Sequence, residues 1–180
     1  MLIYILLGIV AVVLVLFIIS LIMKKEMIIV REITILKSVD VVFNYIRLLR
    51  NQEQYSKWVM ADPAMNKVFT GTDGEVGFIY AWDSSQKQVG KGAQEITAID
   101  PGKQLECEVR FEKPMKGISK TVMSTNSNGA ASTIVKWTFI SNMNCPMRIF
   151  SLFVSIEKML GKDLETSLQQ LKKNLETYNN

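Results

Sequence analysis

Few side chains of this chain could carry chemistry, and the absence of one residue type narrows them further. The sequence has no histidine, which excludes Ser-His-Asp and Cys-His catalysis and the commonest zinc ligands. Its two cysteines, Cys107 and Cys145, do not form a Cys-x-x-Cys pair. We therefore expect no metal site and no cofactor. Both cysteines are interpreted as small apolar core residues, compatible with a reducing compartment.

Motifs for nucleotides and nucleic acids are missing as well. The glycines of residues 71–74 and 90–92 lie among expected strands, whereas a P-loop or a dinucleotide fingerprint precedes a helix. The formal net charge is +4, but the charged residues are interspersed and form no basic block. We therefore predict no nucleic-acid partner.

Acid–base catalysis by a carboxylate remains open, because an acid that faces an apolar cavity has a raised pKa. The candidates are Glu95, in the middle of an expected strand, and Asp83, next to Trp82. The hydroxyl of Tyr80 is a third weak catalytic candidate. A place on the solvated face or at a strand end is the more common situation for Glu and Asp, since charged residues are seldom buried unpaired.

Large apolar residues give a stronger pattern than the carboxylates. They alternate on two expected strands, with a tyrosine hydroxyl and indole nitrogens among them, as is typical of a ligand cavity with a few polar groups. These same side chains could instead fill the core completely, and both interpretations stay open. The predicted cavity lining consists of Phe78, Tyr80, Trp82, Phe111, Met123, Val135, Trp137, Phe139, Phe150 and Phe153.

A series of strands must position these residues. Alternation of period two and intervening turn residues predict strands over 67–72, 76–83, 89–99, 104–113, 117–125 and 132–141, after a first strand over 27–36. In the strand over 104–113, Leu105, Cys107 and Val109 alternate with charged residues. This pattern is typical of an antiparallel sheet with one covered face.

Helices are expected before and after these strands. Apolar residues at helical spacing predict two short helices between Ser38 and Lys57. A long amphipathic helix is predicted from Ile149 to Leu175, and it would cover the apolar face of the sheet. Gly161 interrupts this pattern and suggests a bend or a close backbone approach, although simple tolerance is possible.

The amino-terminal segment has a different composition. Leu2 to Met23 contains no charged residue, and a helix of this length reaches roughly 33 Å, enough for a bilayer core of about 30 Å. Lys24 and Lys25 follow it, so a cytoplasmic C-terminal domain is predicted. A cleaved signal is the alternative, but it lacks a basic start and a cleavage site. We thus expect a transmembrane anchor with a short basic linker over 1–26, a single domain over 27–180, and the bilayer as a partner.

Several stretches over Ile28 to Glu176 resemble the SRPBCC superfamily of START domains, pollen allergens and polyketide cyclases. More closely, they are similar to its polyketide cyclase/dehydrase-like branch with an N-terminal transmembrane segment. The resemblance implies an α+β helix-grip fold, in which a curved antiparallel sheet of about seven strands wraps a long C-terminal helix around an apolar cavity. The matching stretches are residues 30–33, 42–46, Trp58 with Asp62-Pro63, 74–77, 80–82, 89–92, 133–137 and 161–165.

The expected function follows from this resemblance and from the N-terminal segment. It is a membrane-tethered domain that binds a lipid or another hydrophobic small molecule between sheet and helix. The alternatives are a polyketide cyclase/dehydrase-like enzyme and a module that binds a protein or peptide. The sequence identifies no protein partner, and fold alone does not decide among these functions.

Overall fold

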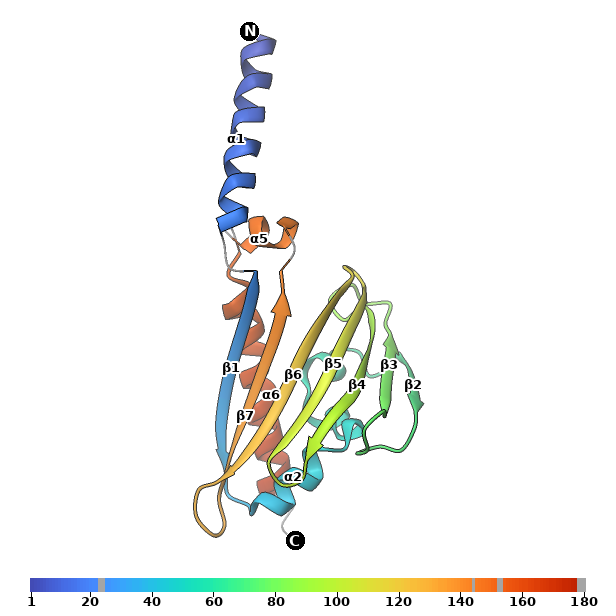
Figure 1. The fold of residues 1–180 in the computed structure, drawn as a ribbon. Coiled ribbons are helices and arrows are strands. Elements are labelled where there is room, and N and C mark those ends of the chain that lie inside the picture. The colour runs from blue at the N-terminus through green and yellow to red at the C-terminus, as the bar shows by residue number, and fades with distance from the viewer. Residues whose placement is uncertain (23–24, 144, 152–153, 178–180) are drawn as a thin grey trace.

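The domain is built on one curved antiparallel sheet. The computed structural model describes the backbone of residues 1–22, 25–143, 145–151 and 154–177, and their side chains except at 2, 12–13, 16, 20–21 and 145–147. Over these residues seven antiparallel strands lie in the order β1-β7-β6-β5-β4-β3-β2 (Figure 1). They are β1 (Glu26–Ile35), β2 (Asn66–Thr70), β3 (Ile79–Asp83), β4 (Lys91–Asp100), β5 (Gln104–Lys113), β6 (Gly117–Ser127) and β7 (Thr133–Asn142).

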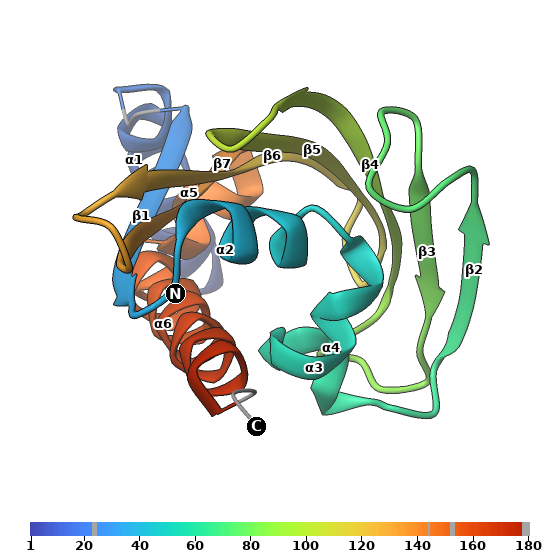
Figure 2. The ribbon, with the colours of Figure 1, turned by 90° about the horizontal axis from the view of Figure 1, so that it is seen from below.

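Helices cover the concave face of this sheet (Figure 2). The longest within the domain, α6 (Ile156–Thr177), packs against β1 and against two of the short helices that follow β1, α3 (Gln52–Tyr55) and α4 (Lys57–Ala61). The other short elements there are α2 (Val39–Ile46) and the 3₁₀ turn η1 (Leu49–Asn51). The sheet and the C-terminal helix confirm the predicted α+β helix-grip fold.

The predicted helix from Ile149 to Leu175 is divided in two. The first part is α5 (Cys145–Ser151), and the second is α6. The new helix begins after Ser155, whose carbonyl oxygen accepts a hydrogen bond from the Met159 amide at 3.1 Å. A serine before an apolar-periodic run is a common helix start, so the sequence held a signal for this boundary.

One end of the space between sheet and helices is filled. Tyr55 of α3 is fully buried, and its ring meets Trp137 of β7 edge-on at a centroid distance of 6.1 Å. Val42, Phe43 and Ile46 of α2 join the same apolar cluster. Burial of such side chains is the main stabilising contribution to a fold of this size. The short helices therefore close this end of the fold.

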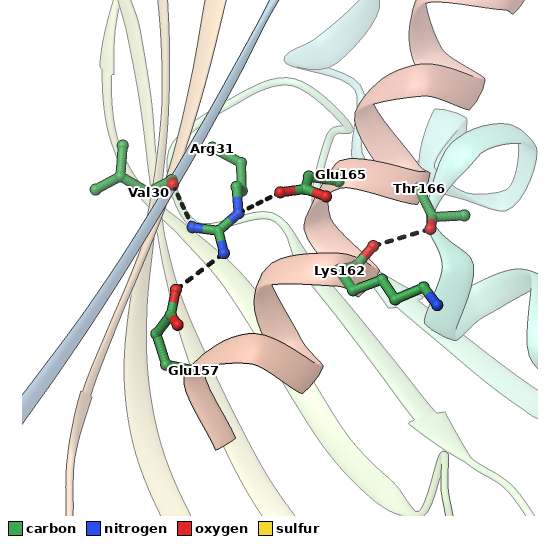
Figure 3. A network of polar contacts seen from close by, with 6 residues as sticks. All are labelled: Val30, Arg31, Glu157, Lys162, Glu165 and Thr166. Carbon is green, nitrogen blue, oxygen red and sulfur yellow. Dashed lines mark hydrogen bonds and ion pairs between the residues drawn. The ribbon is translucent and has the colours of Figure 1, made fainter. Parts of the chain in front are cut away.

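Arg31 of β1 joins the sheet to α6 through two acidic residues (Figure 3). Its Nε donates to Oε1 of Glu165 at 2.7 Å, and its Nη2 donates to Oε1 of Glu157 at 2.9 Å. Gly161 lies between these glutamates in the helix, and a Cβ at this glycine would be 2.1 Å from Nη2 of Arg31. The structure thus shows a close approach at Gly161, but the approaching group is the side chain of Arg31 and not a second backbone segment.

Replacing Gly161 by alanine should change the free energy of unfolding little, but it should remove the salt-sensitive part that the two ion pairs of Arg31 contribute. Alanine gains about 1 kcal/mol in helix propensity, while the displaced guanidinium loses two partly exposed pairs of roughly 0.2–1 kcal/mol each. The net change in the free energy of unfolding is expected within about 1 kcal/mol. Urea unfolding in low and high NaCl should show a weaker salt dependence in Gly161→Ala than in the parent. An unchanged salt dependence would contradict this account.

The amino-terminal prediction requires a correction. Residues Leu2–Ile22 form the helix α1, whose described large apolar side chains are mostly exposed. Over the part of the chain that the structure describes, however, no helix combines the length and the apolar character that a membrane crossing requires. This finding contradicts the transmembrane segment predicted over Leu2 to Met23, and with it the single-pass membrane localisation and cytoplasmic orientation. Met23 and Lys24 lie outside the described residues.

Candidate functional site

A cavity of about 360 Å³ lies between the concave face of the sheet and the first turns of α6. Its walls come from the inner faces of the strands, from the α3–α4 region, and from Ile156, Leu160 and Leu164 of α6. The turn between β5 and β6 borders it at the end opposite to α2. The volume is in the range of small-molecule sites and equals roughly a dozen water molecules.

All three tryptophans of the chain line this cavity: Trp58, Trp82 and Trp137. The rings of Trp58 and Trp137 meet edge-on at a centroid distance of 6.4 Å. The indole nitrogen of Trp137 donates to Oγ1 of Thr121 at 2.6 Å, and that of Trp82 donates to the carbonyl oxygen of Val89 at 3.3 Å. Because protein atoms accept both of these N–H bonds, the two indoles offer mainly apolar surface to the cavity.

A row of mostly polar residues crosses the sheet wall of the cavity. Strand register aligns Ser141, Ser119, Val109, Gln94 and Tyr80 on five neighbouring strands, and all five line the cavity. The two serine hydroxyls bond each other at 2.9 Å. Part of this row is therefore already paired within the protein.

Tyr80 is the exception in this row. Its side chain is only 1 % exposed, and its hydroxyl has no hydrogen-bond partner among the described residues. Burial raises the pKa of Tyr80 well above its usual value, so the group stays a neutral hydroxyl at physiological pH. A buried hydroxyl that makes no hydrogen bond costs free energy, and this cost is removed when a ligand atom binds it.

The thiol of Cys107 lies on the same face of the sheet but outside the cavity lining. It is buried, and desolvation raises its pKa to about 12, although a hydrogen bond with Gln94 acts in the opposite direction. A thiol with so high a pKa is a poor nucleophile. This environment agrees with the interpretation of Cys107 as a core residue.

Neither carboxylate proposed for catalysis lines the cavity. Glu95 neighbours the inward-facing Gln94 in β4, so its side chain points to the other face, where it binds Nη2 of Arg110 at 2.8 Å. Asp83 follows Trp82 and pairs with Lys91 at 3.4 Å, with its side chain 48 % exposed. Among the described lining residues there is no Asp or Glu at all, and Lys113 and Lys116 are the only charged ones. Of the three catalytic candidates, only Tyr80 lies at the cavity.

Half of the predicted lining residues border the cavity: Tyr80, Trp82, Phe111, Trp137 and Phe139. Phe78 is buried beside Phe69, to which its ring is stacked at 6.2 Å. Met123 and Val135 are buried in the filled end, against the cluster around Tyr55. Phe150, on α5, is 52 % exposed. Phe153 lies outside the described residues.

Sequence reasoning missed the polar and helical parts of the lining. Gln94, Ser119 and Ser141 share the inward parity of aromatic residues on neighbouring strands, and that parity was the available signal. The helical contribution, Ile156, Leu160 and Leu164, follows the spacing of four that marks one helix face. Its place at the cavity depends on where α6 begins.

Comparison with known proteins gives no match by sequence and clear matches by structure. No family model and no curated protein matches the chain. Norcoclaurine synthase from Thalictrum flavum, solved in complex with dopamine and hydroxybenzaldehyde, superposes with a TM-score of 0.66 at 12 % identity, over 90 % of this chain and 93 % of that one.

Two further structures are similar. A protein from Mesorhizobium loti superposes with a TM-score of 0.62 at 13 % identity, over 86 % of this chain and 100 % of its own. The protein Ara h 8.0201 does so with a TM-score of 0.56 at 12 % identity, over 85 % of this chain and 97 % of its own. At such identities the likeness concerns the fold alone. The chain has the Bet v1-like helix-grip fold of the SRPBCC proteins.

Proposed function

We propose that this chain binds a small, mainly apolar molecule in the cavity between sheet and α6, with a polar atom of that molecule bonded to Tyr80. The observation that carries the proposal is a cavity lined by three tryptophans, with the unpartnered hydroxyl of Tyr80 buried in its wall. Buried polar groups in folded proteins are nearly always paired. A ligand that supplies the missing partner explains the exception.

The lining supports a binding role energetically. Apolar contact stabilises a ligand by about 25 cal/mol per Å² removed from water, and a few placed polar groups then fix its orientation. Trp137 and the pair Ser119–Ser141 already have hydrogen-bond partners within the protein. Of these residues, Tyr80 has the hydroxyl that still lacks a partner among the described residues.

Binding is better supported than acid–base catalysis. An enzyme of that type needs a group that changes protonation near neutral pH, and no carboxylate is found among the described lining residues. Burial raises the pKa of Tyr80, so the phenolate that could accept a proton is not populated near neutral pH. The complex of norcoclaurine synthase with two small aromatic molecules shows only that a similar fold accommodates ligands of this size.

Tryptophan fluorescence provides a direct test, because every tryptophan of the chain lines the cavity. The uncharged probe N-phenyl-1-naphthylamine should quench this emission by energy transfer and saturate at one probe per chain. The same titration of the urea-unfolded chain is the control. Absence of saturable quenching in the folded protein would refute the proposal.

Replacing Tyr80 by phenylalanine should stabilise the ligand-free protein and weaken the binding of a hydrogen-bonding ligand. Removal of an unpaired buried hydroxyl is expected to raise the free energy of unfolding by about 1 kcal/mol. Displacement of the probe should show 2-naphthol bound roughly 2- to 12-fold more weakly, as one hydrogen bond implies, with naphthalene unchanged. A destabilised variant, or equal weakening of both compounds, would contradict the role given to Tyr80.

A further inference from the structure

We infer that the ligand is an amphipathic organic anion, whose apolar body fills the cavity and whose acidic group is bound by Lys113 and Lys116 at the cavity mouth. The inference rests on the proposed function and names the chemical class of its ligand. It is carried by the distribution of charge around the cavity.

Both lysines lie at the same end of the site. Lys113 ends β5, and Lys116 directly precedes the first residue of β6, so the two flank the turn that borders the cavity. Asn142 at the end of β7 and Gln88 from the β3–β4 turn line the cavity near the same end of the sheet. The filled end, closed by α2 and α3, lies opposite. The mouth is therefore positively charged, and the described residues that line the interior carry no charge.

Neither lysine is neutralised by the protein. Other lysines of the sheet have carboxylate partners: Lys91 with Glu112 at 3.5 Å and Lys136 with Glu32 at 3.9 Å. Among the described residues, no ion pair involves Lys113 or Lys116. The chain contains 17 acidic residues, yet none of the described lining residues is one. A ligand anion at the mouth would thus meet two unpaired cations and no competing carboxylate.

The anionic group and the Tyr80 hydroxyl would contact different parts of one ligand. Lys113 is four residues beyond Val109 in β5, and register places Val109 in the same row as Tyr80. Four residues of strand correspond to about 13 Å. Between the two rows lie Phe111 and Trp82, whose rings meet at 6.2 Å. The site therefore fits a molecule with an acidic end, an apolar middle and a hydrogen-bonding atom deeper inside.

Three ten-carbon probes of different charge test the inference: sodium decanoate, 1-decanol and decyltrimethylammonium bromide, each displacing N-phenyl-1-naphthylamine. Decanoate should bind about three- to tenfold more tightly than decanol, as expected for exposed ion pairs, and the cation should bind most weakly. High NaCl should reduce the preference for decanoate. The double variant Lys113→Gln/Lys116→Gln should bind decanoate and decanol equally well.

The matched control is Lys162→Gln/Lys173→Gln, which removes the same charge from two exposed positions of α6 outside the lining. It should keep the preference for decanoate. If decanol displaces the probe but decanoate has no advantage, or if the mouth variant keeps that advantage, the inference is overturned while the proposed function stands. If the folded protein binds neither the probe nor decanol, the proposed function itself is refuted, and the inference about the ligand's charge falls with it.

Discussion

Replacing Gly90 by alanine should lower the free energy of unfolding by about 2–5 kcal/mol. Gly90 has a φ of +66°, and a Cβ there would lie 2.1 Å from the carbonyl oxygen of Lys113. The left-handed conformation costs an alanine about 1–2 kcal/mol, and a forced contact in a packed region costs about 1–3 kcal/mol. Because the contacted atom belongs to the backbone, it cannot move aside as a side chain can.

The control for this experiment is Gly102→Ala. Gly102 has a similar φ of +72°, but the nearest atom to its Cβ would be Cγ1 of Val39 at 3.9 Å. Only the conformational cost applies there, so we expect a loss of about 1–2 kcal/mol. Urea unfolding followed by tryptophan fluorescence measures both variants. Equal losses of unfolding free energy in the two variants would mean that the close approach of Gly90 to the Lys113 carbonyl adds no cost of its own.

Replacing Gly117 by phenylalanine should weaken ligand binding at least tenfold while the fold is kept. Gly117 lines the cavity, and a Cβ built on it meets no atom within 4 Å. It is two residues before the inward-facing Ser119 in β6, so a side chain at this position faces the same side. A phenyl ring there would occupy space that the ligand needs. Displacement of N-phenyl-1-naphthylamine measures the loss.

Ile118→Phe is the matched control, because it places the same ring one residue away on the other face of the sheet. Ile118 is 60 % exposed and does not line the cavity. This variant should bind the probe like the parent. Unchanged binding in Gly117→Phe, with its fold verified by circular dichroism, would place the ligand elsewhere.

Residue periodicity predicted much of the fold and the inward parity of the cavity walls. Trp82, Phe111 and Phe139 line the cavity because alternation fixes which face of a strand a residue occupies. Alternation does not fix how far along the sheet the space stays open. Val135 has the same parity as Phe139 but lies where the short helices fill the interior. How far the open space extends along the sheet is set by the packing of these helices against it.

Polar residues on both faces of β4 mean that the sequence does not show whether Gln94 or the proposed carboxylate Glu95 faces the cavity. Gln94 faces the cavity and Glu95 faces Arg110, and neither residue type marks a face by itself. The strand also has a register irregularity between Ile96 and Ala98, which disturbs any extrapolation of parity along it. Only the pairing with β3 and β5 identifies the inner residue.

The pairing of β1 with β7 has a consequence for how the chain acquires its structure. Glu26 of β1 pairs with Asn142 of β7, so one edge of the sheet joins segments from opposite ends of the domain. Such long-range contacts slow folding, because a long loop must close before they form. During synthesis β1 leaves the ribosome long before its partner, with apolar side chains and unpaired backbone groups exposed. The cavity forms only after β7 and α6 have been made, so a shortened chain that ends before β7 should not retain ligand binding.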